Sequence, residues 1–458
     1  MEEIRTVKLE KTVRKLLEEK KYKTLRDILI TLEPADISAI FEELEKESAP
    51  LLFRLLPKEL AAETFAELEP EWQEHLIRGF SDRELREVVN ELYVDDAADL
   101  VEEMPANVVK RILEQTDPQM RKEVNEILRY PEDSAGSIMT TEYVSLRPSM
   151  TVRDAIQRIR RTGVDKETIY TCYVTEERKL LGTVSVKDLL LQTDDDTPVS
   201  EIMDENVISV HTLTDQETVA QMLSHYNFLA LPVLDQGERM VGIVTFDDAM
   251  DVLVEETTED IEKMAGMLPS DKTYLRSSAW DLFIHRIPWL ALLMISATFT
   301  GMIITGFENA LAAQVVLTAF IPMLMDTGGN SGSQASVTVI RALSLGELEF
   351  SDVLLVIWKE IQTAVLCGVA LSLLCFAKIM FVDRMLLGNT AISVATAGVV
   401  CATMAVTVLI AKMVGCTLPM FAKKLGFDPA VMASPFITTI VDALSLLVYF
   451  SIAKALLF

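Results

Sequence analysis

The chain has 458 residues, with 42 Lys and Arg against 69 Asp and Glu, so its formal net charge is −27 although 50% of its residues are hydrophobic. This length exceeds one compact core and predicts at least two domains. Residues 285–458 hold as many basic as acidic residues, so the whole excess of negative charge lies on residues 1–284. Such a surface repels nucleic acid and concentrates cations, so we expect no nucleic-acid partner.

The five cysteines form no CxxC pair, and four of them lie in the apolar C-terminal part. They are expected to be small buried hydrophobes, neither disulfides nor zinc ligands. The N-terminus has no apolar signal-peptide core. We therefore expect the acidic part to begin and stay in the cytoplasm.

Residues 1–130 repeat an amphipathic helical pattern, with apolar residues at three-to-four spacing. Breaks marked by Pro or Asp separate the helices, as in LEPADISAIFEELEKE and LLPKELAAETFAELEP. Each helix is too short to be stable alone, so we expect the helices to stack as an α-helical superhelix.

Residues 131–252 contain an internal repeat. SIMTTEYVSLRPSMTVRDAIQRI recurs as EIMDENVISVHTLTDQETVAQML, and LLGTVSVKDLL recurs as MVGIVTFDDAM. Each copy reads as a short strand, a helix, two β-rich runs and a closing helix. The pattern resembles a tandem pair of CBS domains, an α/β regulatory module.

Residues 251–289 read as an acidic helix and then an amphipathic helix that leads into the membrane, so we expect a connecting (plug) helix within residues 253–284. Residues 285–458 carry five apolar stretches, at 287–304, 311–325, 361–381, 391–410 and 435–453. Each is near the ~20 residues that span a bilayer, and the second is short and interrupted. The fold class expected is a multidomain membrane protein with an all-α domain of five spans. With a cytoplasmic start, the Lys and Arg bias agrees with the positive-inside rule and places the C-terminus outside.

The fifth apolar stretch carries Asp442 in its interior. A carboxylate at membrane depth costs at least ~2.5–3.5 kcal/mol, so it must face a pore, a partner or an ion. The alternative is a packing or capping Asp near one interface. Thr438 and Thr439 precede Asp442 by one turn. Pro435 is expected to break the helical ladder and free backbone carbonyls toward a cavity.

The second apolar stretch ends in IPMLMDTGGNSGSQASVTVIRALSLGEL. Its glycines, Gly328 among them, do not favour a helix, since each costs up to ~1 kcal/mol relative to Ala. With Pro322, Asp326 and Asn330 they predict a broken, polar segment that lines a cavity. The alternative is an ordinary cytoplasmic loop followed by a capped helix.

A second group of candidates is a run of seven acids in fourteen residues with no base before Lys263. The run consists of Asp247, Asp248, Asp251, Glu255, Glu256, Glu259 and Asp260. A solvated helix face is the commonest role of such a run. Asp95 and Asp96 form a further acidic pair in the helical domain, and Asp428 precedes the fifth stretch.

The segments PMLMDTGGNSGSQASVTVIRALSLGEL and DPAVMASPFITTIVDALSLLVYF resemble the signature segments of the MgtE family of magnesium channels. The order of domains matches that family over nearly the whole chain. The resemblance implies a homodimer in the cell membrane with its pore between the second and fifth spans of both subunits. It implies that Asp442 of each subunit binds hydrated Mg²⁺. Pro322 and residues 326–334 would then form the neighbouring wall.

The resemblance also implies that cytoplasmic Mg²⁺ bridges the acidic faces of the N domain, the CBS pair and the connecting helix, and so closes the pore. The best candidate ligands by position are Asp96, Asp248, Asp251, Glu256, Glu259 and Asp428. Asp95, Asp247 and Glu217 come next. The family often has an acid just before the aromatic at Phe228, where this chain has Asn227, which puts one intersubunit site in doubt.

Both CBS copies contain a Gly-x-x-Ser/Thr-x-x-Asp pattern that resembles the ribose-phosphate grip of nucleotide-binding CBS domains. The candidates are Ser185, Asp188, Thr245 and Asp248, with Tyr170 or Phe228 stacking on the base. ATP is therefore a candidate regulatory ligand. Many CBS pairs keep this pattern without a ligand.

The sequence excludes some alternative classes of protein and leaves others open. An ion-coupled exchanger, or a channel for cobalt or manganese, is not separated from a magnesium channel by sequence. An intramembrane metalloprotease needs HExxH and an ATP-driven pump needs a phosphate loop, and the chain has neither, so we expect no enzyme. A nucleotide-sensing scaffold with an inert anchor leaves Asp442 without a role.

Overall fold

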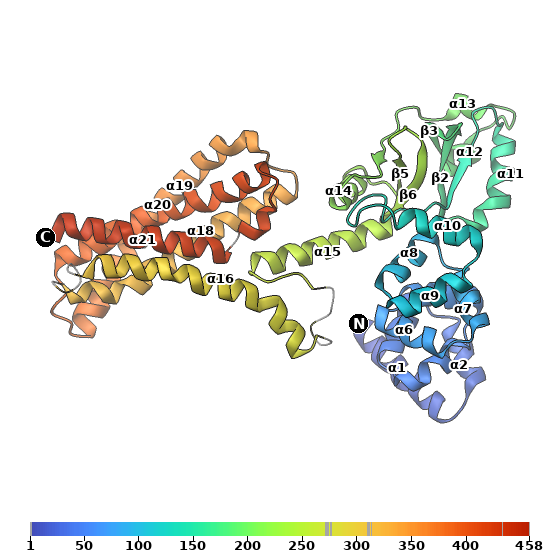
Figure 1. Ribbon diagram of the computed structural model, residues 1–458. Helices are drawn as coiled ribbons and strands as arrows, with labels where there is room; N and C mark the ends of the chain where they lie inside the picture. The colour runs from blue at the N-terminus through green and yellow to red at the C-terminus, as the bar shows by residue number, and fades with distance from the viewer. Residues whose placement is uncertain are drawn as a thin grey trace. The chain divides into compact units, whose positions relative to one another are not determined.

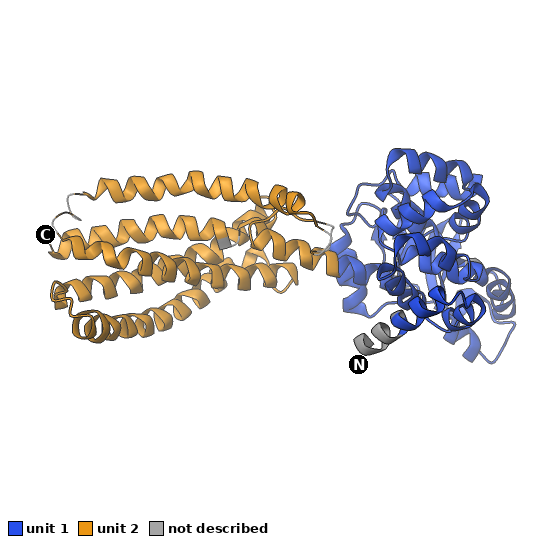
Figure 2. Cartoon of the chain, turned by 90° about the horizontal axis from the view of Figure 1, so that it is seen from below, with its two compact units in different colours: residues 1–253 blue, residues 254–458 orange. Residues whose placement is uncertain are grey.

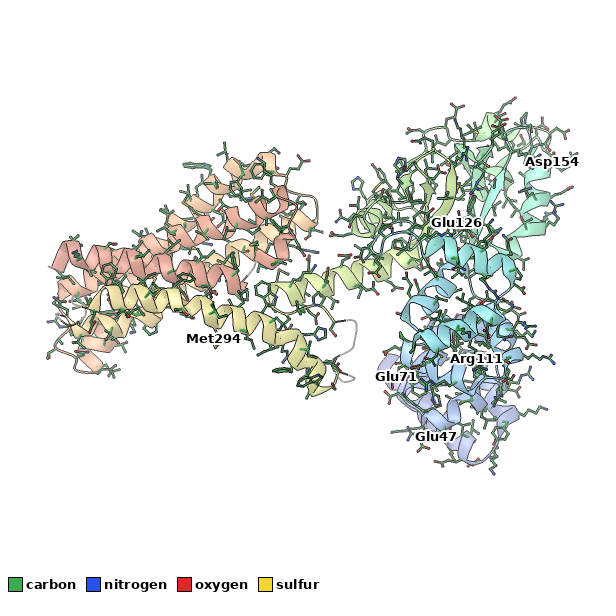
Figure 3. All side chains as sticks on the ribbon, viewed as in Figure 1. Glu47, Glu71, Arg111, Glu126, Asp154 and Met294 are labelled. Atoms are coloured by element: carbon green, nitrogen blue, oxygen red, sulfur yellow. The ribbon has the colours of Figure 1, made fainter. Side chains whose placement is uncertain are left out.

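The computed structural model describes residues 2–270, 274, 277–308, 312, 314–432 and 434–457. They form two compact units, unit 1 (residues 1–253) and unit 2 (residues 254–458), coloured separately in Figure 2. Exposed acids such as Glu47, Glu71 and Asp154 lie on unit 1, whereas exposed apolar side chains such as Met294, 71% exposed, lie on unit 2 (Figure 3). An apolar surface of this kind needs a partner other than water.

Unit 1 begins with a series of short helices, as the sequence predicts (Figure 1). Prolines begin α3, α6 and α10, where a missing N–H leaves no hydrogen bond unmade. Ser81 and Glu84 form a capping box at the start of α7. The helices are α1 (Glu2–Glu18), α2 (Tyr22–Leu29), α3 (Pro34–Glu42), α4 (Ala49–Phe53), α5 (Lys58–Ala66), α6 (Pro70–Gly79), α7 (Asp82–Val89), α8 (Val94–Glu103), α9 (Ala106–Gln115) and α10 (Pro118–Ile127).

The internal repeat folds as two matching halves, each with a three-stranded sheet of one parallel and one antiparallel pairing. The first half contains β1 (Tyr143–Leu146), α11 (Val152–Thr162), β2 (Thr168–Glu176), β3 (Lys179–Ser185) and α12 (Val186–Leu191). The second contains α13 (Val199–Ile202), β4 (Val210–His211), α14 (Gln216–Tyr226), β5 (Ala230–Leu234) and β6 (Met240–Thr245).

The two halves exchange their opening segments. Thr140, just before β1, pairs with Ile243 of β6, and Asp204, before β4, pairs with Thr183 of β3. A Cβ on Gly242 would meet the Thr140 carbonyl oxygen at 2.7 Å. Glycine is therefore required at this close approach, and the equivalent crossing in the other half has the same need.

The connecting segment over 253–284 contains the end of one helix and the start of another, and its residues 271–273, 275 and 276 lie outside the described residues. Helix α15 (Phe246–Met264) continues from β6 and ends at a hydrogen bond from Met267 N to Glu262 O (2.9 Å), with Gly266 at φ +71. Helix α16 (Ala279–Gly306) begins at a capping box formed by Ser278 and Asp281. The amphipathic part of the segment is therefore the first turns of α16.

Unit 2 is helical. Four stretches of the described residues are long and apolar enough to cross a membrane: Ala279–Gly306, Phe350–Leu386, Val394–Lys424 and Pro429–Leu457. They correspond to the first, third, fourth and fifth predicted stretches. The long helices after α16 are α18 (Ile321–Ser344), α19 (Val353–Ala377), α20 (Val394–Lys424) and α21 (Ser434–Leu457).

The prediction of a broken segment after residue 322 is wrong. Helix α18 is continuous, follows a 3₁₀ turn at Val315–Phe320, and begins ten residues later than the predicted second stretch, whose residues 311 and 313 lie outside the described residues. Its glycines let neighbouring helices approach. A Cβ on Gly415 of α20 would lie 2.2 Å from the Gly332 carbonyl oxygen, and one on Gly328 would lie 2.7 Å from Thr407. Close packing thus offsets their low helix propensity.

Candidate functional sites

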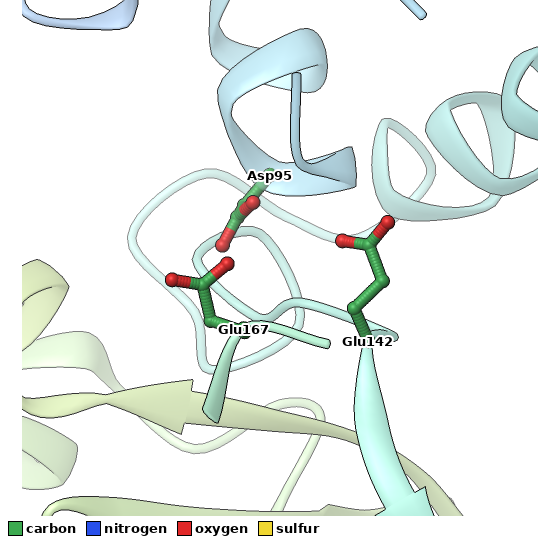
Figure 4. A group of neighbouring side chains, drawn as sticks. All are labelled: Asp95, Glu142 and Glu167. Carbon is green, nitrogen blue, oxygen red and sulfur yellow. The ribbon is translucent and has the colours of Figure 1, made fainter. Parts of the chain in front are cut away.

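Three carboxylates from separate segments of unit 1 converge (Figure 4). Asp95 lies in the first turn of α8, Glu142 directly precedes β1, and Glu167 directly precedes β2. One oxygen from each lies within 4.8 Å of the others. The Val94 N–H donates to Glu142 Oε2 at 3.1 Å, which ties the start of α8 to the CBS pair. The group is therefore built by tertiary contact between the helical domain and the repeat.

Asp248, at the start of α15, also acts on this group. The Thr245 hydroxyl donates to the Asp248 carboxylate, which fixes the side chain. Burial raises the pKa of Asp96 to about 7, and repulsion from Asp248 adds to the shift. Burial, followed by repulsion from Asp248, likewise raises the pKa of Glu167 to about 8 and that of Asp95 well above its usual range.

Burial is also the main cause at Asp248, whose pKa rises to about 6, and at Asp99, whose pKa rises to about 8. Burial raises the pKa of Glu142 as well. Hydrogen bonds from the Val94 N–H and the Thr140 hydroxyl, and the nearby charge of Lys166, lower that pKa in part but do not reverse the change. We name Asp95, Asp96, Glu142, Glu167 and Asp248 the acidic junction. Such carboxylates must either take up protons or gather a cation, because an unpaired buried charge is costly.

The chemistry of the donors indicates which cation fits. All are hard carboxylate oxygens, which suit Mg²⁺ and Ca²⁺ better than softer metals. Mg²⁺ usually keeps several of its waters and takes one or two carboxylates, so it needs no complete cage of protein ligands. The acidic junction meets that requirement.

The other predicted sensing residues fall into separate groups. Burial raises the pKa of Glu67 in the helical domain, and repulsion from Asp251 and Asp247 raises it further. Gln221 Nε2 donates to Glu217 Oε1 at 3.1 Å on α14. Glu255 and Glu256 lie on α15.

In unit 2, the later acids of α15 contact the membrane domain. The Ser344 hydroxyl donates to Asp260 Oδ2 at 3.2 Å. Lys263 Nζ lies 2.7 Å from Glu259 Oε1 and 2.7 Å from Asp428 Oδ2. The structure therefore brings Glu259, Asp260 and Asp428 together, with a lysine that the sequence did not single out as part of the site.

Asp442 lies half-buried in α21, and the carboxyl of Asp326 on α18 is close enough to repel it. Asn330 Nδ2 donates to Asp326 Oδ1 at 3.2 Å. The hydroxyls of Thr438 and Thr439 both donate to the Pro435 carbonyl, at 2.9 and 3.1 Å. Pro435 is the second residue of α21, where its missing N–H leaves no helical hydrogen bond unmade, so the predicted opening of the backbone toward a cavity stays a prediction.

One face of α18 is both polar and exposed. Pro322, Asp326, Asn330 and Gln334 follow one another at four-residue spacing, and all are exposed. Gly328, predicted to line the same cavity, is instead buried against Thr407. The polar residues of this segment thus divide into an exposed stripe and a packed face.

A cavity of about 260 Å³ lies in the CBS pair. Ser185, Asp188 and Phe228 line it, as predicted for a nucleotide site, and the buried Tyr173 hydroxyl, which has no hydrogen-bond partner, lines it too. Tyr170, Thr245 and Asp248 are absent from the lining among the described residues. Tyr170 is 67% exposed.

Three family profiles match in chain order. They are the MgtE intracellular N domain over residues 32–133, CBS domains over 135–192 and 199–255, and MgtE, described as a divalent cation transporter, over 321–452. The magnesium transporter MgtE of Thermus thermophilus is 38% identical over 455 residues, which cover 98% of this chain and 99% of that protein.

This chain belongs to the MgtE family.

A second MgtE relative, the magnesium transporter of Bacillus subtilis, is 34% identical and covers 96% of this chain and 95% of its own length. A crystal structure of the cytosolic domain of the Mg²⁺ channel MgtE in complex with ATP is 40% identical, with TM-score 0.51, and covers 53% of this chain and 99% of that chain. A crystal structure of the soluble part of a magnesium transporter is 31% identical, with TM-score 0.52, and covers 55% of this chain and 99% of that chain.

Membership confirms several predictions. MgtE proteins are transporters, not enzymes, and magnesium transport, CBS domains and membrane-crossing helices are features of this chain. The helical N domain and the CBS pair are confirmed as folds.

Glu142 and Glu167 were missed by the sequence reading. Glu142 had a signal that could have been used: in the alignment of the two repeats it occupies the position of Asn206, which lines the nucleotide cavity. The two copies therefore differ in charge at this position, and a charge present in only one copy is a candidate for a separate role. Glu167 carries no such signal, because it lies between the repeated segments 137–159 and 180–190 and has no counterpart in their alignment.

Proposed function

We propose that this MgtE-family protein is a magnesium-selective channel, a homodimer that cytoplasmic Mg²⁺ closes by binding between its acidic domains. The observation that carries the transport part is a carboxylate pair inside a membrane domain. Asp442 on α21 and Asp326 on α18 repel each other, and within the described part of the chain no base acts on Asp442. A carboxylate at membrane depth marks an ion path.

The exposed polar stripe of α18 supports the dimer. A span with Asp326, Asn330 and Gln334 facing outward cannot face lipid without cost, so a second copy of the chain would cover it. We infer that α18 is the second of five crossings, that two stripes face one pore, and that the two Asp442 side chains hold a hydrated ion there. The N-terminal domains would then be cytoplasmic and the C-terminus extracytoplasmic.

Substitution of Asp442 tests the pore. Asp442→Asn keeps the shape of the side chain and removes the charge, so we expect Mg²⁺ current in planar bilayers to fall at least about a hundredfold, as for the loss of an ion-binding charge. Glu308→Gln, which removes an exposed charge just after α16, is the matched control and should leave the current unchanged. A full Mg²⁺ current through the folded Asp442→Asn dimer would refute the role of Asp442.

The acidic junction supports closure by Mg²⁺. Its carboxylates come from both the helical domain and the CBS pair, so an ion bound there stabilises their contact. Moving a population from mostly open to mostly closed needs about 5.5 kcal/mol of differential binding, which several weak sites can supply together. Asp251, Glu256, Glu259 and Asp428 are the further candidates.

Deletion of residues 1–130 tests the gate. It removes Asp95 and Asp96, so we expect a channel that still conducts at high cytoplasmic Mg²⁺. Normal closure of the truncated channel would exclude the helical domain from gating. A dependence of the current on a proton or sodium gradient would favour the exchanger instead.

ATP is the proposed modulator. The cavity of about 260 Å³ would take the nucleoside part, with Asp188 accepting from ribose hydroxyls and Phe228 against the base. The ATP-bound cytosolic domain of a related channel supports this assignment. Phe228→Ala should weaken ATP binding by calorimetry, whereas the exposed Tyr170→Ala should not.

A further inference from the structure

The C-terminal part of α15 is anchored on two helices of unit 2. Met264 packs against Ile340 of α18 and Ala430, which lies just before α21. Gly266 is so close to Pro435, the second residue of α21, that an added Cβ would meet its ring at 2.9 Å. The end of α15 therefore touches the segments that carry Asp326 and Asp442 in the proposed pore.

A lysine lies at the centre of this anchor. Lys263 Nζ lies 2.7 Å from Glu259 Oε1 and donates to Asp428 Oδ2 at 2.7 Å, across 165 positions of sequence. Its side chain is 21% exposed, against 37% for Glu259 and 34% for Asp428. The other oxygen of Asp428 accepts the Ala430 N–H at 2.7 Å. Both carboxylates are thus already neutralised in part by a cation of the chain itself.

The position of Lys263 has a consequence for Mg²⁺. Glu259 and Asp428 are candidate sensing ligands, yet the ammonium group occupies the space between the oxygens that a divalent ion would use. An ammonium group and a divalent ion repel strongly at such distances. Mg²⁺ can therefore bridge these two carboxylates only after the lysine has moved away.

We propose that Lys263 is an internal counter-ion of the gate: it supplies part of the attraction between α15 and the pore helices when Mg²⁺ is scarce, and Mg²⁺ replaces it between Glu259 and Asp428 and strengthens that attraction. This inference rests on the proposed function, since it concerns the regulation of the same site. The contact between α15 and the pore helices then always includes a cation between Glu259 and Asp428, either Lys263 or Mg²⁺. Lys263 therefore reduces the effect of Mg²⁺ on the docking of α15, because the lysine already supplies part of the docking free energy that the ion would contribute.

A simple structural role for the ion pair predicts a different pattern. If Lys263 and Mg²⁺ act at separate places, then removing the lysine weakens the docking of α15 by the same factor with and without Mg²⁺. If they replace one another, removal weakens docking only without Mg²⁺. The effect of one substitution at two Mg²⁺ concentrations therefore separates the two roles.

The test uses hydrogen exchange of the backbone amides of residues 254–264 in the full-length protein, in EDTA and in saturating Mg²⁺. We expect Lys263→Gln to exchange about fivefold faster than wild type in EDTA, as for the loss of a partly exposed ion pair, and to match wild type in saturating Mg²⁺. Lys263→Arg keeps a cation and should follow wild type in both.

Lys110→Gln is the matched control, because Lys110 is 79% exposed and, among the residues that the structure describes, its ion pair is with Glu114 on its own helix. It should leave exchange in residues 254–264 unchanged. A loss of protection in Lys263→Gln that persists in saturating Mg²⁺, or no loss in EDTA, would overturn the replacement of Lys263 by Mg²⁺. Wild-type protein whose α15 amides do not respond to Mg²⁺ at all would overturn the proposed gating together with it.

Discussion

The two units bury carboxylates in different ways. At the acidic junction of unit 1, Asp95, Glu142 and Glu167 face one another, and Lys166 is the base that offsets the pKa shift of Glu142. In unit 2, two largely buried acids each lie beside a lysine. Lys412 Nζ lies 3.6 Å from Glu360 Oε2, with side chains 7% and 15% exposed, and Lys378 Nζ lies 2.8 Å from Asp383 Oδ2.

This difference separates structural charges from binding charges. A carboxylate paired with a lysine in its own unit has its charge balanced by the fold. A group of carboxylates without such a balance is stable only with protons or with an ion from solution. By this criterion we propose the acidic junction and the Asp326–Asp442 pair as cation sites, whereas Glu259 and Asp428 become available to a cation only when Lys263 moves away. The pair formed by Lys412 and Glu360 is structural.

The largest expected effect comes from breaking the buried pair of unit 2. Lys412→Met leaves Glu360 charged and unpaired, so we expect the protein to lose about 3–5 kcal/mol of stability. The double variant Lys412→Met, Glu360→Met should recover most of that loss. Lys378→Met should cost less, because its lysine is 49% exposed and the ion pair is therefore partly hydrated. Thermal unfolding of the detergent-solubilised protein measures all three, and equal losses in the single and double Lys412 variants would contradict a structural pair.

A smaller effect is expected at the acidic junction when pH is changed without Mg²⁺. The folded pKa of Glu167 is about 8 and that of Asp96 about 7, both above their unfolded values. The folded state therefore binds more protons, and its stability falls as pH rises through the range from about 4 to about 8. We expect protection of the α8 amides, corrected for intrinsic exchange, to fall about tenfold between pH 5 and pH 8 in EDTA.

Magnesium provides the control for that experiment. A bound divalent ion replaces the protons, so added Mg²⁺ should restore protection of α8 at pH 8 and do little at pH 5. Protection that is independent of pH in EDTA would mean that the carboxylates are neither protonated nor unstable there.

The smallest expected effect is a change in Mg²⁺ response when the missed acids are neutralised. Glu142→Gln with Glu167→Gln removes two charges from the acidic junction, so α8 should be more protected in EDTA and gain about fivefold less from Mg²⁺. Glu176→Gln, at an exposed position at the end of β2, is the matched control. An undiminished Mg²⁺ response in the double variant would restrict the site to Asp95, Asp96 and Asp248.

Much of the architecture could be predicted because it is written in local patterns. The repeat was visible as two similar segments, and their common fold follows from the same alternation of apolar residues. Asp442 could be found because a charge within an apolar stretch stands out without any structure. The glycines near Gly328 were misread, since low helix propensity and close helix packing have the same sequence signature.

By itself, the sequence determined the order of the domains, the membrane part and the identity of the most exceptional charge, because composition and periodicity are properties of neighbouring residues. Tertiary structure decided which charges meet. Asp95 and Glu167 are 72 positions apart, and Lys263 and Asp428 are 165 apart. Electrostatic interactions depend on distance in space, and only the packed chain sets that distance.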